Sequence, residues 1–222
     1  PGSTKAAISR KGNIYLSEYC VQNKVPFKNT GKLLVPRNDE EYKNMAHFID
    51  VGTKNQVPCK IIDLKEAKDI EPNVGCKYDK VFYSPTTSIA DQHVLIKTLE
   101  KELNDKKITI LKSTKYITKE PKNTIVTDKG KIEYKYFINC AGQYSDTVAK
   151  TFGKGKDYSI MPVVGIYLDY KTDRTAPALF KTLIYPVPML EVQFPGAHWC
   201  MDTDGVLKLG PCFTPVLWRE QY

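Results

Sequence analysis

The chain has 222 residues, of which 41% are hydrophobic and 26% are charged. This balance is typical of a globular protein and excludes a disordered or collagen-like chain. Lys and Arg number 33 against 25 Asp and Glu, which gives a net charge of +8. No run of the sequence approaches the ~20 continuous apolar residues of a membrane-spanning helix.

The excess positive charge comes from lysines that are spread along the whole chain. Arginine stands only at Arg10, Arg37, Arg174 and Arg219. Proteins that bind nucleic acids usually concentrate basic residues on one face, with aromatic residues between them. We therefore expect no nucleic-acid partner, although a lysine-rich surface raises the local concentration of an anionic substrate.

Cysteines and histidines give no sign of a metal or redox centre. The six cysteines, at 20, 59, 76, 140, 200 and 212, never occur with C-x-x-C spacing. The absence of such pairs predicts free thiols in a reducing compartment. The three histidines form no cluster, so no metal site is expected. Cys20 and Cys140 stand among apolar residues, and we expect both to be buried.

The first half of the chain predicts helices alternating with short strands. Helical spacing favours a helix over Thr4–Asn23, and a second helix begins after Asn38 or Asp39. Asp63 and Glu66 have the spacing of a capping box. The remaining expected elements are strands at 31–36 and 80–84, a helix at 63–68, and a helix from about 89 to 104 with an apolar stripe of Val94, Leu95, Leu99 and Leu103.

The second half predicts mainly strands. They are expected at 108–111, 114–118, 124–127 and 131–134, the last two forming a hairpin. Tyr136–Cys140 is apolar on both faces, as a buried strand would be. A helix follows over Ser145–Phe152, and 159–210 is rich in strand signals. The whole pattern predicts an α/β (α+β) fold with two interleaved domains.

One local motif has the character of a ligand site. In Phe137–Gly142 a strand ends in small residues, and a helix begins near Ser145 and Asp146. Small residues let a ligand approach the backbone closely, and a helix N-terminus favours negative charge. An ordinary tight turn between strand and helix explains the same residues, and on the local pattern alone it is the commoner explanation.

A series of short motifs in the same order along nearly the whole chain resembles one family. They include Pro1–Ala6, Phe27–Leu33, Glu71-Pro72, Tyr83–Asp91, Ile138–Gly142, Tyr185–Pro188, Asp204-Gly205, Gly210-Pro211 and Arg219–Tyr222. Together they resemble the FAD-dependent oxidoreductases of the D-amino-acid-oxidase superfamily. Within it they are most similar to L-2-hydroxyglutarate oxidases and dehydrogenases.

The resemblance implies a division of labour between two domains. Residues 1–30, 85–158 and 211–222 would form part of a Rossmann-like FAD-binding domain. Residues 31–84 and 159–210 would form a substrate domain built on a mixed or antiparallel sheet. Four residues of the small-residue turn would lie against the FAD, namely Asn139, Cys140, Ala141 and Gly142. Tyr116 would lie at the adenine end of the cofactor.

The reaction implied is the oxidation of a 2-hydroxy acid, similar to L-2-hydroxyglutarate, to a 2-oxo acid by hydride transfer to the flavin. His198 is the candidate base. Arg219 is the candidate partner of a substrate carboxylate, and Tyr167 and Tyr185 are candidate hydrogen-bond donors to substrate. A structural histidine, a structural ion pair and core aromatic residues remain open as alternatives.

The chain also departs from the family pattern. It has no G-x-G-x-x-G turn for the FAD pyrophosphate, so we expect it to be the central portion of an oxidoreductase. Such a portion is expected to bind FAD poorly alone and to need a partner chain or its missing ends. Three residues also differ from those usual in the family. The family usually has Arg at the position of Val164, an acidic residue at that of Ile166, and Arg at that of Met201.

These departures keep two other functions open. One is a degenerate oxidoreductase fold that acts as a non-catalytic structural subunit. The other is a related flavoenzyme that oxidises an amine or glycerol 3-phosphate. The resemblance implies a mitochondrial or cytoplasmic location.

Overall fold

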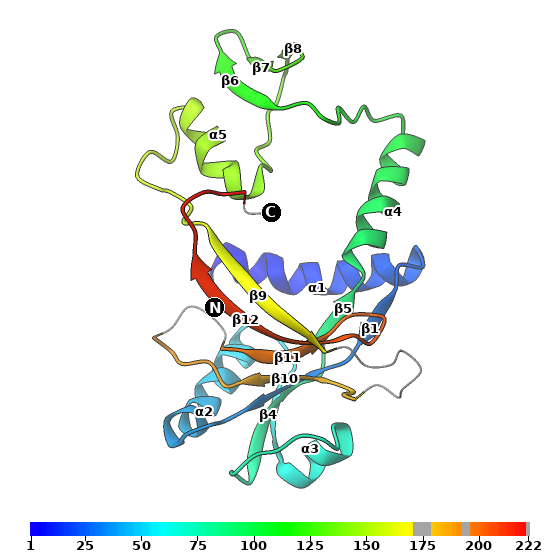
Figure 1. Cartoon of the computed structure of the whole chain (residues 1–222), viewed down its shortest axis with the longest axis vertical. Helices are drawn as coiled ribbons and strands as arrows, with labels where there is room; N and C mark the ends of the chain where they lie inside the picture. Colours follow the sequence, from blue (N-terminus) through cyan, green and yellow to red (C-terminus); the bar gives the residue numbers. More distant parts are fainter. Residues whose placement is uncertain (171–178, 192–195, 221–222) are drawn as a thin grey trace. The chain divides into compact units, whose positions relative to one another are not determined.

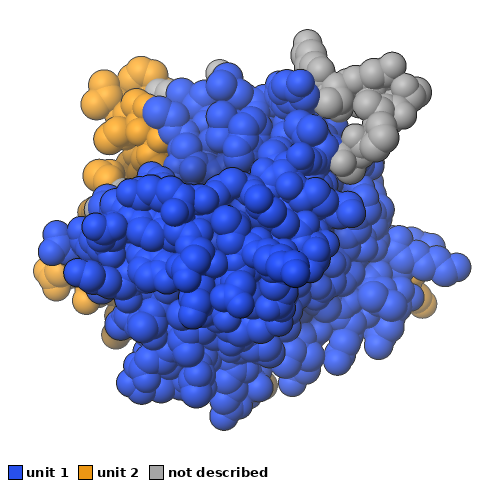
Figure 2. All heavy atoms as spheres, turned by 90° about the horizontal axis from the view of Figure 1, so that it is seen from below, with its two compact units in different colours: residues 1–102, 166–212 blue, residues 103–165, 213–222 orange. Residues whose placement is uncertain are grey.

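A computed structural model of the chain describes residues 1–170, 179–191 and 196–220. The chain divides into two compact units, coloured separately in Figure 2. The first comprises residues 1–102 and 166–212, and the second comprises 103–165 and 213–222. Each unit combines segments distant in sequence, and the expected mixed α/β fold is confirmed.

The first unit is built on the largest sheet of the described residues (Figure 1). Its strands lie in the order β3-β4-β2-β10-β11-β12-β9. The bounds are β2 Lys32–Val35, β3 Lys60–Asp63, β4 Lys80–Ser84, β9 Val163–Tyr170, β10 Leu183–Pro186, β11 His198–Met201 and β12 Leu207–Pro215. A two-stranded sheet pairs β1 Phe27–Asn29 with β5 Ser88–Ala90.

One parallel pairing joins the two sequence segments of the first unit. β2 and β10 run parallel, with Leu33 opposite Ile184. The pairs β2–β4, β3–β4, β10–β11 and β11–β12 are antiparallel. The centre of the sheet therefore forms only when residues near 33 meet residues near 184.

Helices pack on the two faces of this sheet at its β3–β4–β2 end (Figure 1). Successive side chains of a strand point to opposite faces. Leu34 packs with Met45 of α2, which spans Asp39–Lys54, whereas Leu33 packs with Ala67 of α3, which spans Leu64–Ile70. Neighbouring residues of β2 thus enter two separate apolar clusters.

The helix signals were mostly, but not entirely, confirmed. Asn38 caps α2 by accepting a hydrogen bond from the Glu41 backbone N–H at 2.9 Å. The predicted capping box was wrong, because the Asp63 side chain makes no capping hydrogen bond. Glu66 instead pairs with the Lys60 ammonium at 2.5 Å.

The two remaining long helices of the described residues are largely exposed. They are α1 Thr4–Gln22 and α4 Gln92–Asp105. Only Cys20 is buried in α1, as expected for that thiol, and the apolar stripe of α4 contains no buried residue. No described helix combines the length and apolar character needed to cross a membrane.

The second unit contains a three-stranded antiparallel sheet and two short helices. Its elements are β6 Tyr116–Glu120, β7 Thr124–Thr127, β8 Gly130–Glu133, the 3-10 helix η1 Gly142–Tyr144 and α5 Ser145–Thr151. The β7–β8 hairpin was predicted from its turn residues and is confirmed.

Two predicted strands of the second unit are wrong. Residues 108–111 and 136–140 are irregular. The Ile138 side chain is 82% exposed, and Cys140 is exposed rather than buried. A strand needs a neighbour for its backbone N–H and C=O groups, and the described part of the chain places no strand beside either segment.

Candidate active site

Aromatic side chains of three strands meet on one face of the large sheet. Ile184 lies opposite Trp199 in the antiparallel β10–β11 pair, so Tyr185 lies beside His198. Their rings stack with centroids 3.6 Å apart and an interplanar angle of 14°. Tyr167 of β9 approaches His198 edge-on at 6.3 Å. The structure therefore brings together three residues that the sequence singled out separately.

His198 has the tautomer and environment of a proton acceptor. Its side chain is buried, and Nδ1 lies 2.9 Å from the Gly196 carbonyl oxygen. Because a carbonyl oxygen only accepts, Nδ1 carries the proton and Nε2 keeps its lone pair. Burial lowers the pKa of His198; the hydrogen bond to Gly196 opposes this shift, and the positive charge of Lys32 adds to it, so the pKa stays below its usual value. The imidazole is therefore neutral at pH 7.

The two tyrosines of the cluster remain phenols at neutral pH. Burial raises the pKa of Tyr185 to about 12. Burial also raises the pKa of Tyr167. A protonated phenol is a hydrogen-bond donor, so both residues have the chemistry expected of groups that orient an oxygen of a substrate.

A glycine lets the edge-on tyrosine approach the cluster. Gly210 of β12 lies opposite His198 and has φ +155°. A Cβ atom at Gly210 would lie 2.7 Å from the Ile166 carbonyl oxygen and 2.9 Å from Cδ1 of Tyr167. Any side chain at position 210 would therefore displace β9 or Tyr167.

Lys32 of β2 belongs to the same cluster and was missed by the sequence reasoning. Its Nζ lies 5.0 Å from the centre of the Tyr185 ring. Burial lowers the pKa of this ammonium. One signal in the sequence could have identified Lys32. Residues two apart in a strand share a face, so Lys32 was expected on the same face as Leu34, which is buried.

Four of the five predicted cofactor residues line one hollow in the second unit. This hollow has a volume of about 230 Å³. Its walls include Tyr116, Asn139, Cys140 and Ala141, together with apolar side chains such as Leu111, Ile125, Ile132, Ile138 and Val148. The fifth residue, Gly142, begins η1 and does not line the hollow.

Asn139 fixes the turn at the edge of this hollow. Its Nδ2 donates to the Ser145 carbonyl oxygen at 2.7 Å, and its Oδ1 accepts from the Ala141 N–H at 3.1 Å. The hollow is smaller than the roughly 300–1,000 Å³ of sites that enclose a drug-sized ligand. Its apolar walls therefore fit one aromatic part of FAD and not the whole molecule.

Arg219 lies in the second unit, where its guanidinium is already engaged. Nη1 and Nη2 donate to the two carboxylate oxygens of Asp146 at 2.5 and 2.8 Å. Nη1 also donates to the Gln143 carbonyl oxygen, and the guanidinium lies over the Tyr144 ring. This arrangement matches the structural ion pair that the sequence left open; binding of a substrate carboxylate stays a prediction.

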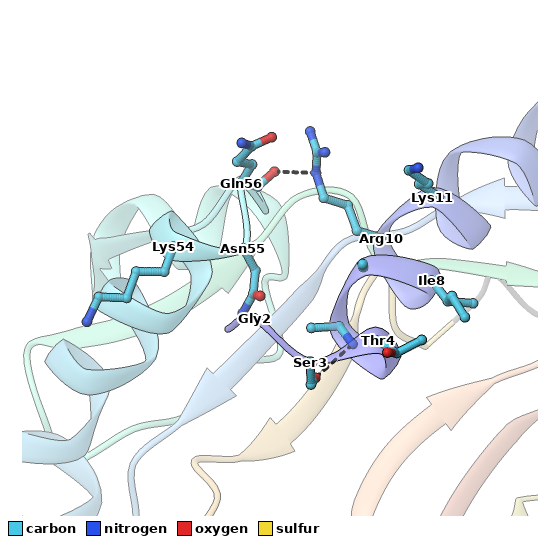
Figure 3. A pocket seen from close by; sticks show the side chains of 11 residues that line it. Gly2, Ser3, Thr4, Ile8, Arg10, Lys11, Lys54, Asn55 and Gln56 are labelled. Carbon is cyan, nitrogen blue, oxygen red and sulfur yellow. Dashed lines mark hydrogen bonds between the residues drawn. The ribbon is translucent and has the colours of Figure 1, made fainter.

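A separate pocket of about 500 Å³ lies at the start of α1 (Figure 3). Arg10 crosses its edge and donates from Nε to the Gln56 carbonyl oxygen at 3.0 Å. Lys11 and Lys54 also line it. It contains no residue predicted for the site. Among the described residues, no cluster of His, Cys, Asp and Glu is able to hold a metal ion.

Comparison with known proteins identifies the family. Residues 2–220 match the family described as DAO, FAD dependent oxidoreductase. The chain belongs to this family. DAO proteins are FAD-dependent oxidoreductases, as the resemblance of the motifs implied.

Curated relatives are about 30% identical to this chain over the aligned residues. It is 32% identical over 227 residues to an L-2-hydroxyglutarate dehydrogenase of Indibacter alkaliphilus, covering 100% of this chain and 56% of the relative. It is 33% identical over 235 residues to the mitochondrial L-2-hydroxyglutarate dehydrogenase of Caenorhabditis briggsae, covering 100% and 52%. The chain thus spans about half the length of these relatives.

Other similar proteins are named for other substrates. A glycerol 3-phosphate dehydrogenase of Caloramator mitchellensis is 29% identical over 192 residues, covering 85% of this chain and 39% of the relative. Solved structures share the fold at lower identity. L-proline dehydrogenase from P. horikoshii has a TM-score of 0.77 at 18% identity, covering 92% of this chain and 54% of its own. An FAD-bound L-α-glycerophosphate oxidase from Mycoplasma pneumoniae has a TM-score of 0.73 at 20% identity, covering 88% and 52%.

Proposed function

We propose that the protein oxidises a 2-hydroxy acid, of the L-2-hydroxyglutarate type, to the corresponding 2-oxo acid, with FAD as the electron acceptor. The observation that carries this proposal is the buried, neutral His198 stacked on Tyr185 at 3.6 Å. Similarity to L-2-hydroxyglutarate dehydrogenases along the whole chain supports the substrate class.

When bound, FAD supplies the acceptor for the hydride that leaves the carbon bearing the hydroxyl group. The residues of this chain handle the proton and the orientation of the substrate. Nε2 of His198 accepts the hydroxyl proton, because Nδ1 is held protonated by the Gly196 carbonyl. The phenols of Tyr185 and Tyr167 donate hydrogen bonds that hold the substrate oxygens beside the imidazole.

The cofactor is proposed to contact the second unit. Tyr116, Asn139, Cys140 and Ala141 hold an aromatic part of FAD in the hollow that they line. Gly142 is proposed to approach the cofactor through its backbone. In this proposal residues 31–84 and 159–210 carry the substrate, while 1–30, 85–158 and 211–222 contribute to the cofactor domain.

Two further functions are candidates. The glycerol 3-phosphate dehydrogenase among the relatives makes a phosphorylated alcohol a candidate substrate, and the cation Lys32 in the cluster suits any anion. A non-catalytic structural role is the other alternative, since Val164 and Met201 replace expected arginines. Relatives named as mitochondrial support a mitochondrial location, with a cytoplasmic one as the alternative.

The first experiment is the visible spectrum of the FAD-loaded full-length protein under anaerobic conditions. We expect the flavin band to bleach on addition of L-2-hydroxyglutarate. Bleaching by glycerol 3-phosphate or L-proline alone would replace the proposed substrate class. A protein that binds no flavin would support the structural role instead.

A histidine variant tests the proposed base. His198→Asn is expected to retain FAD but to slow bleaching by about 10²- to 10⁴-fold, the usual contribution of general acid–base catalysis. His93→Asn is the matched control, because His93 is exposed on α4. Equal rates for the two variants would remove His198 from the mechanism.

Cysteine labelling tests the proposed cofactor hollow without measuring activity. Cys140 and Cys212 are both exposed, but only Cys140 lines the hollow. FAD is therefore expected to protect Cys140 from maleimide and to leave Cys212 reactive, as read by mass spectrometry of the digested protein. Equal labelling of both thiols with and without FAD would contradict this placement.

A further inference from the structure

Among the residues that the structure describes, one ammonium group beside the proposed base has no acidic partner. Lys32 stands on β2, next to β10, and its Nζ lies 5.0 Å from the Tyr185 ring centre. His198 stacks on the ring of the same tyrosine at 3.6 Å. Across residues 1–170, 179–191 and 196–220, no carboxylate forms an ion pair with Lys32 and no hydrogen bond from its Nζ occurs.

Another lysine of the same sheet, Lys60, provides a comparison, because it lies over a tyrosine and is paired with an acid. Lys60 also lies over a tyrosine, with Nζ 6.0 Å from the Tyr83 ring centre. Its Nζ is paired with Glu66 at 2.5 Å, and both side chains of this pair are about half exposed. Lys32 also lies over a tyrosine, in a more buried place, and no acid in the described part of the chain pairs with it.

Keeping a partly buried ammonium without an anion is unfavourable. Removing a charge from water costs free energy unless a partner replaces the lost solvent. The lowered pKa of Lys32, caused by burial, reflects this cost. Residues with this kind of perturbation are concentrated at functional sites, where a ligand supplies the missing partner.

Distances within the cluster limit the ligand. Since Lys32 and His198 are measured from the same Tyr185 ring, Nζ lies within about 9 Å of the imidazole centre. This value is an upper limit on the separation. A ligand with a hydroxyl group and a carboxylate on neighbouring carbon atoms, and with a hydrogen bond of about 2.8 Å at each end, spans distances up to this limit.

We propose that Lys32 binds the carboxylate next to the carbon that is oxidised, and so selects 2-hydroxy acids over neutral alcohols. This assignment rests on the proposed function, since it takes His198 as the group that receives the hydroxyl proton. It also supplies a cation to a chain in which Val164 and Met201 stand where the family resemblance led us to expect arginines.

The test compares binding of anions by the FAD-loaded full-length protein, followed by isothermal titration calorimetry. The probes are 2-oxoglutarate and pyruvate, which the proposed reaction cannot oxidise further. Lys32→Met is expected to weaken their binding by about 10- to 100-fold, the range for a hydrogen bond to a charged group. Lys32→Arg is expected to stay within about threefold of the wild type, since it keeps the charge.

Lys60→Met is the matched control, because it removes a lysine from over a tyrosine of the same sheet but outside the cluster. It is expected to bind both anions as the wild type does. Lys32→Met that binds within threefold of the wild type would overturn the assignment. A loss of the same size in Lys60→Met would overturn it as well.

A neutral analogue separates contact with the carboxylate from a structural effect. Pyruvate and pyruvamide differ only in whether the group next to the carbonyl carbon is charged. The wild type is expected to bind pyruvate at least 10-fold more tightly than pyruvamide, and Lys32→Met is expected to lose this preference. Equal weakening of both ligands in Lys32→Met would overturn the assignment.

The outcome for Lys32 is separable from that for the overall function. If L-2-hydroxyglutarate bleaches the flavin but Lys32→Met binds anions as tightly as the wild type, only the assignment of Lys32 fails. If no hydroxy acid bleaches the flavin while Lys32→Met abolishes anion binding, the proposed oxidation fails and Lys32 remains an anion-binding residue. A wild type that binds none of these anions overturns the role of Lys32.

Discussion

The two compact units are stabilised by different kinds of interaction. The first contains two apolar clusters, one around Leu33 and one around Met45. In the second, Val148 is the one hydrophobic residue found buried among those described. The two apolar clusters lie where helices cover the two faces of the large sheet. The second unit has no such covered sheet among its described residues, and its apolar core is correspondingly small.

Polar and aromatic contacts replace a core in the second unit. The rings of Phe137 and Phe152 stack at 4.7 Å, and Tyr134 packs against both. The buried carboxylate of Asp146 accepts hydrogen bonds from Arg219 and from the Ile160 backbone N–H. This carboxylate joins α5 to the backbone at Ile160 and to Arg219, which lies 73 residues later in the sequence.

Core truncation should reveal the largest difference between the units. Leu33→Ala is expected to lower the free energy of unfolding of the first unit by about 2–5 kcal/mol, because it leaves a cavity among buried side chains. Ile138→Ala is expected to stay within about 0.5 kcal/mol, since Ile138 is 82% exposed. Hydrogen exchange read by mass spectrometry measures both, and similar losses would contradict the comparison.

A smaller effect is expected from filling the space beside the aromatic cluster. Gly210→Ala should cost about 1–3 kcal/mol, since the added Cβ meets the Ile166 carbonyl oxygen and Tyr167 in addition to the backbone strain. Gly205→Ala is the control, with φ +88° and no atom within 4 Å of its Cβ. Thermal unfolding of both variants gives the difference, and equal midpoints would argue against a tight approach at Gly210.

The acid stability of the second unit gives the subtlest contrast. The Arg219 guanidinium, and then the Ile160 N–H, hold the pKa of Asp146 well below its usual range. A carboxyl group with a depressed folded pKa stabilises the fold above its unfolded pKa, about 3.9, and this stabilisation is lost as the pH falls toward the folded value. Asp146→Asn should therefore increase opening of residues 142–160 at pH 5–7, and its difference from the wild type should shrink below about pH 4.

Hydrogen exchange corrected for the intrinsic rate at each pH measures this opening. Asp157→Asn is the control, because Asp157 is exposed in the same unit. A difference between Asp146→Asn and the wild type that persists unchanged at pH 3 would contradict the ion-pair explanation.

Local signals in the sequence predicted local structure well. Asn38 marked the start of α2, and the turn residues near Gly130 marked the β7–β8 hairpin, because capping and turn chemistry act within a few residues. The strand predicted at 136–140 failed for the opposite reason. The apolar residues of this segment are compatible with a buried strand. A strand also needs a neighbouring strand for its backbone hydrogen bonds, and the local sequence does not reveal whether one is present.

The candidate site shows the same division. Motif resemblance pointed to His198, Tyr185 and Tyr167, but only the register of three strands brings their rings together. Lys32 resembled one of many surface lysines in a basic chain, and its position on the buried face became evident only from the sheet. The pairing of Arg219 with Asp146 joins residues 73 positions apart, and no periodicity predicts that.

The parallel pairing of β2 with β10 has a consequence for synthesis of the chain in the cell. The partner of Lys32 is Leu183, about 150 residues later. At 5–20 residues per second a ribosome needs roughly 8–30 seconds to make that interval. During this time the edge of β2 that faces β10 has no partner, and an open apolar edge invites aggregation. Chaperones that bind extended apolar segments are therefore expected to hold the nascent chain until β10 emerges.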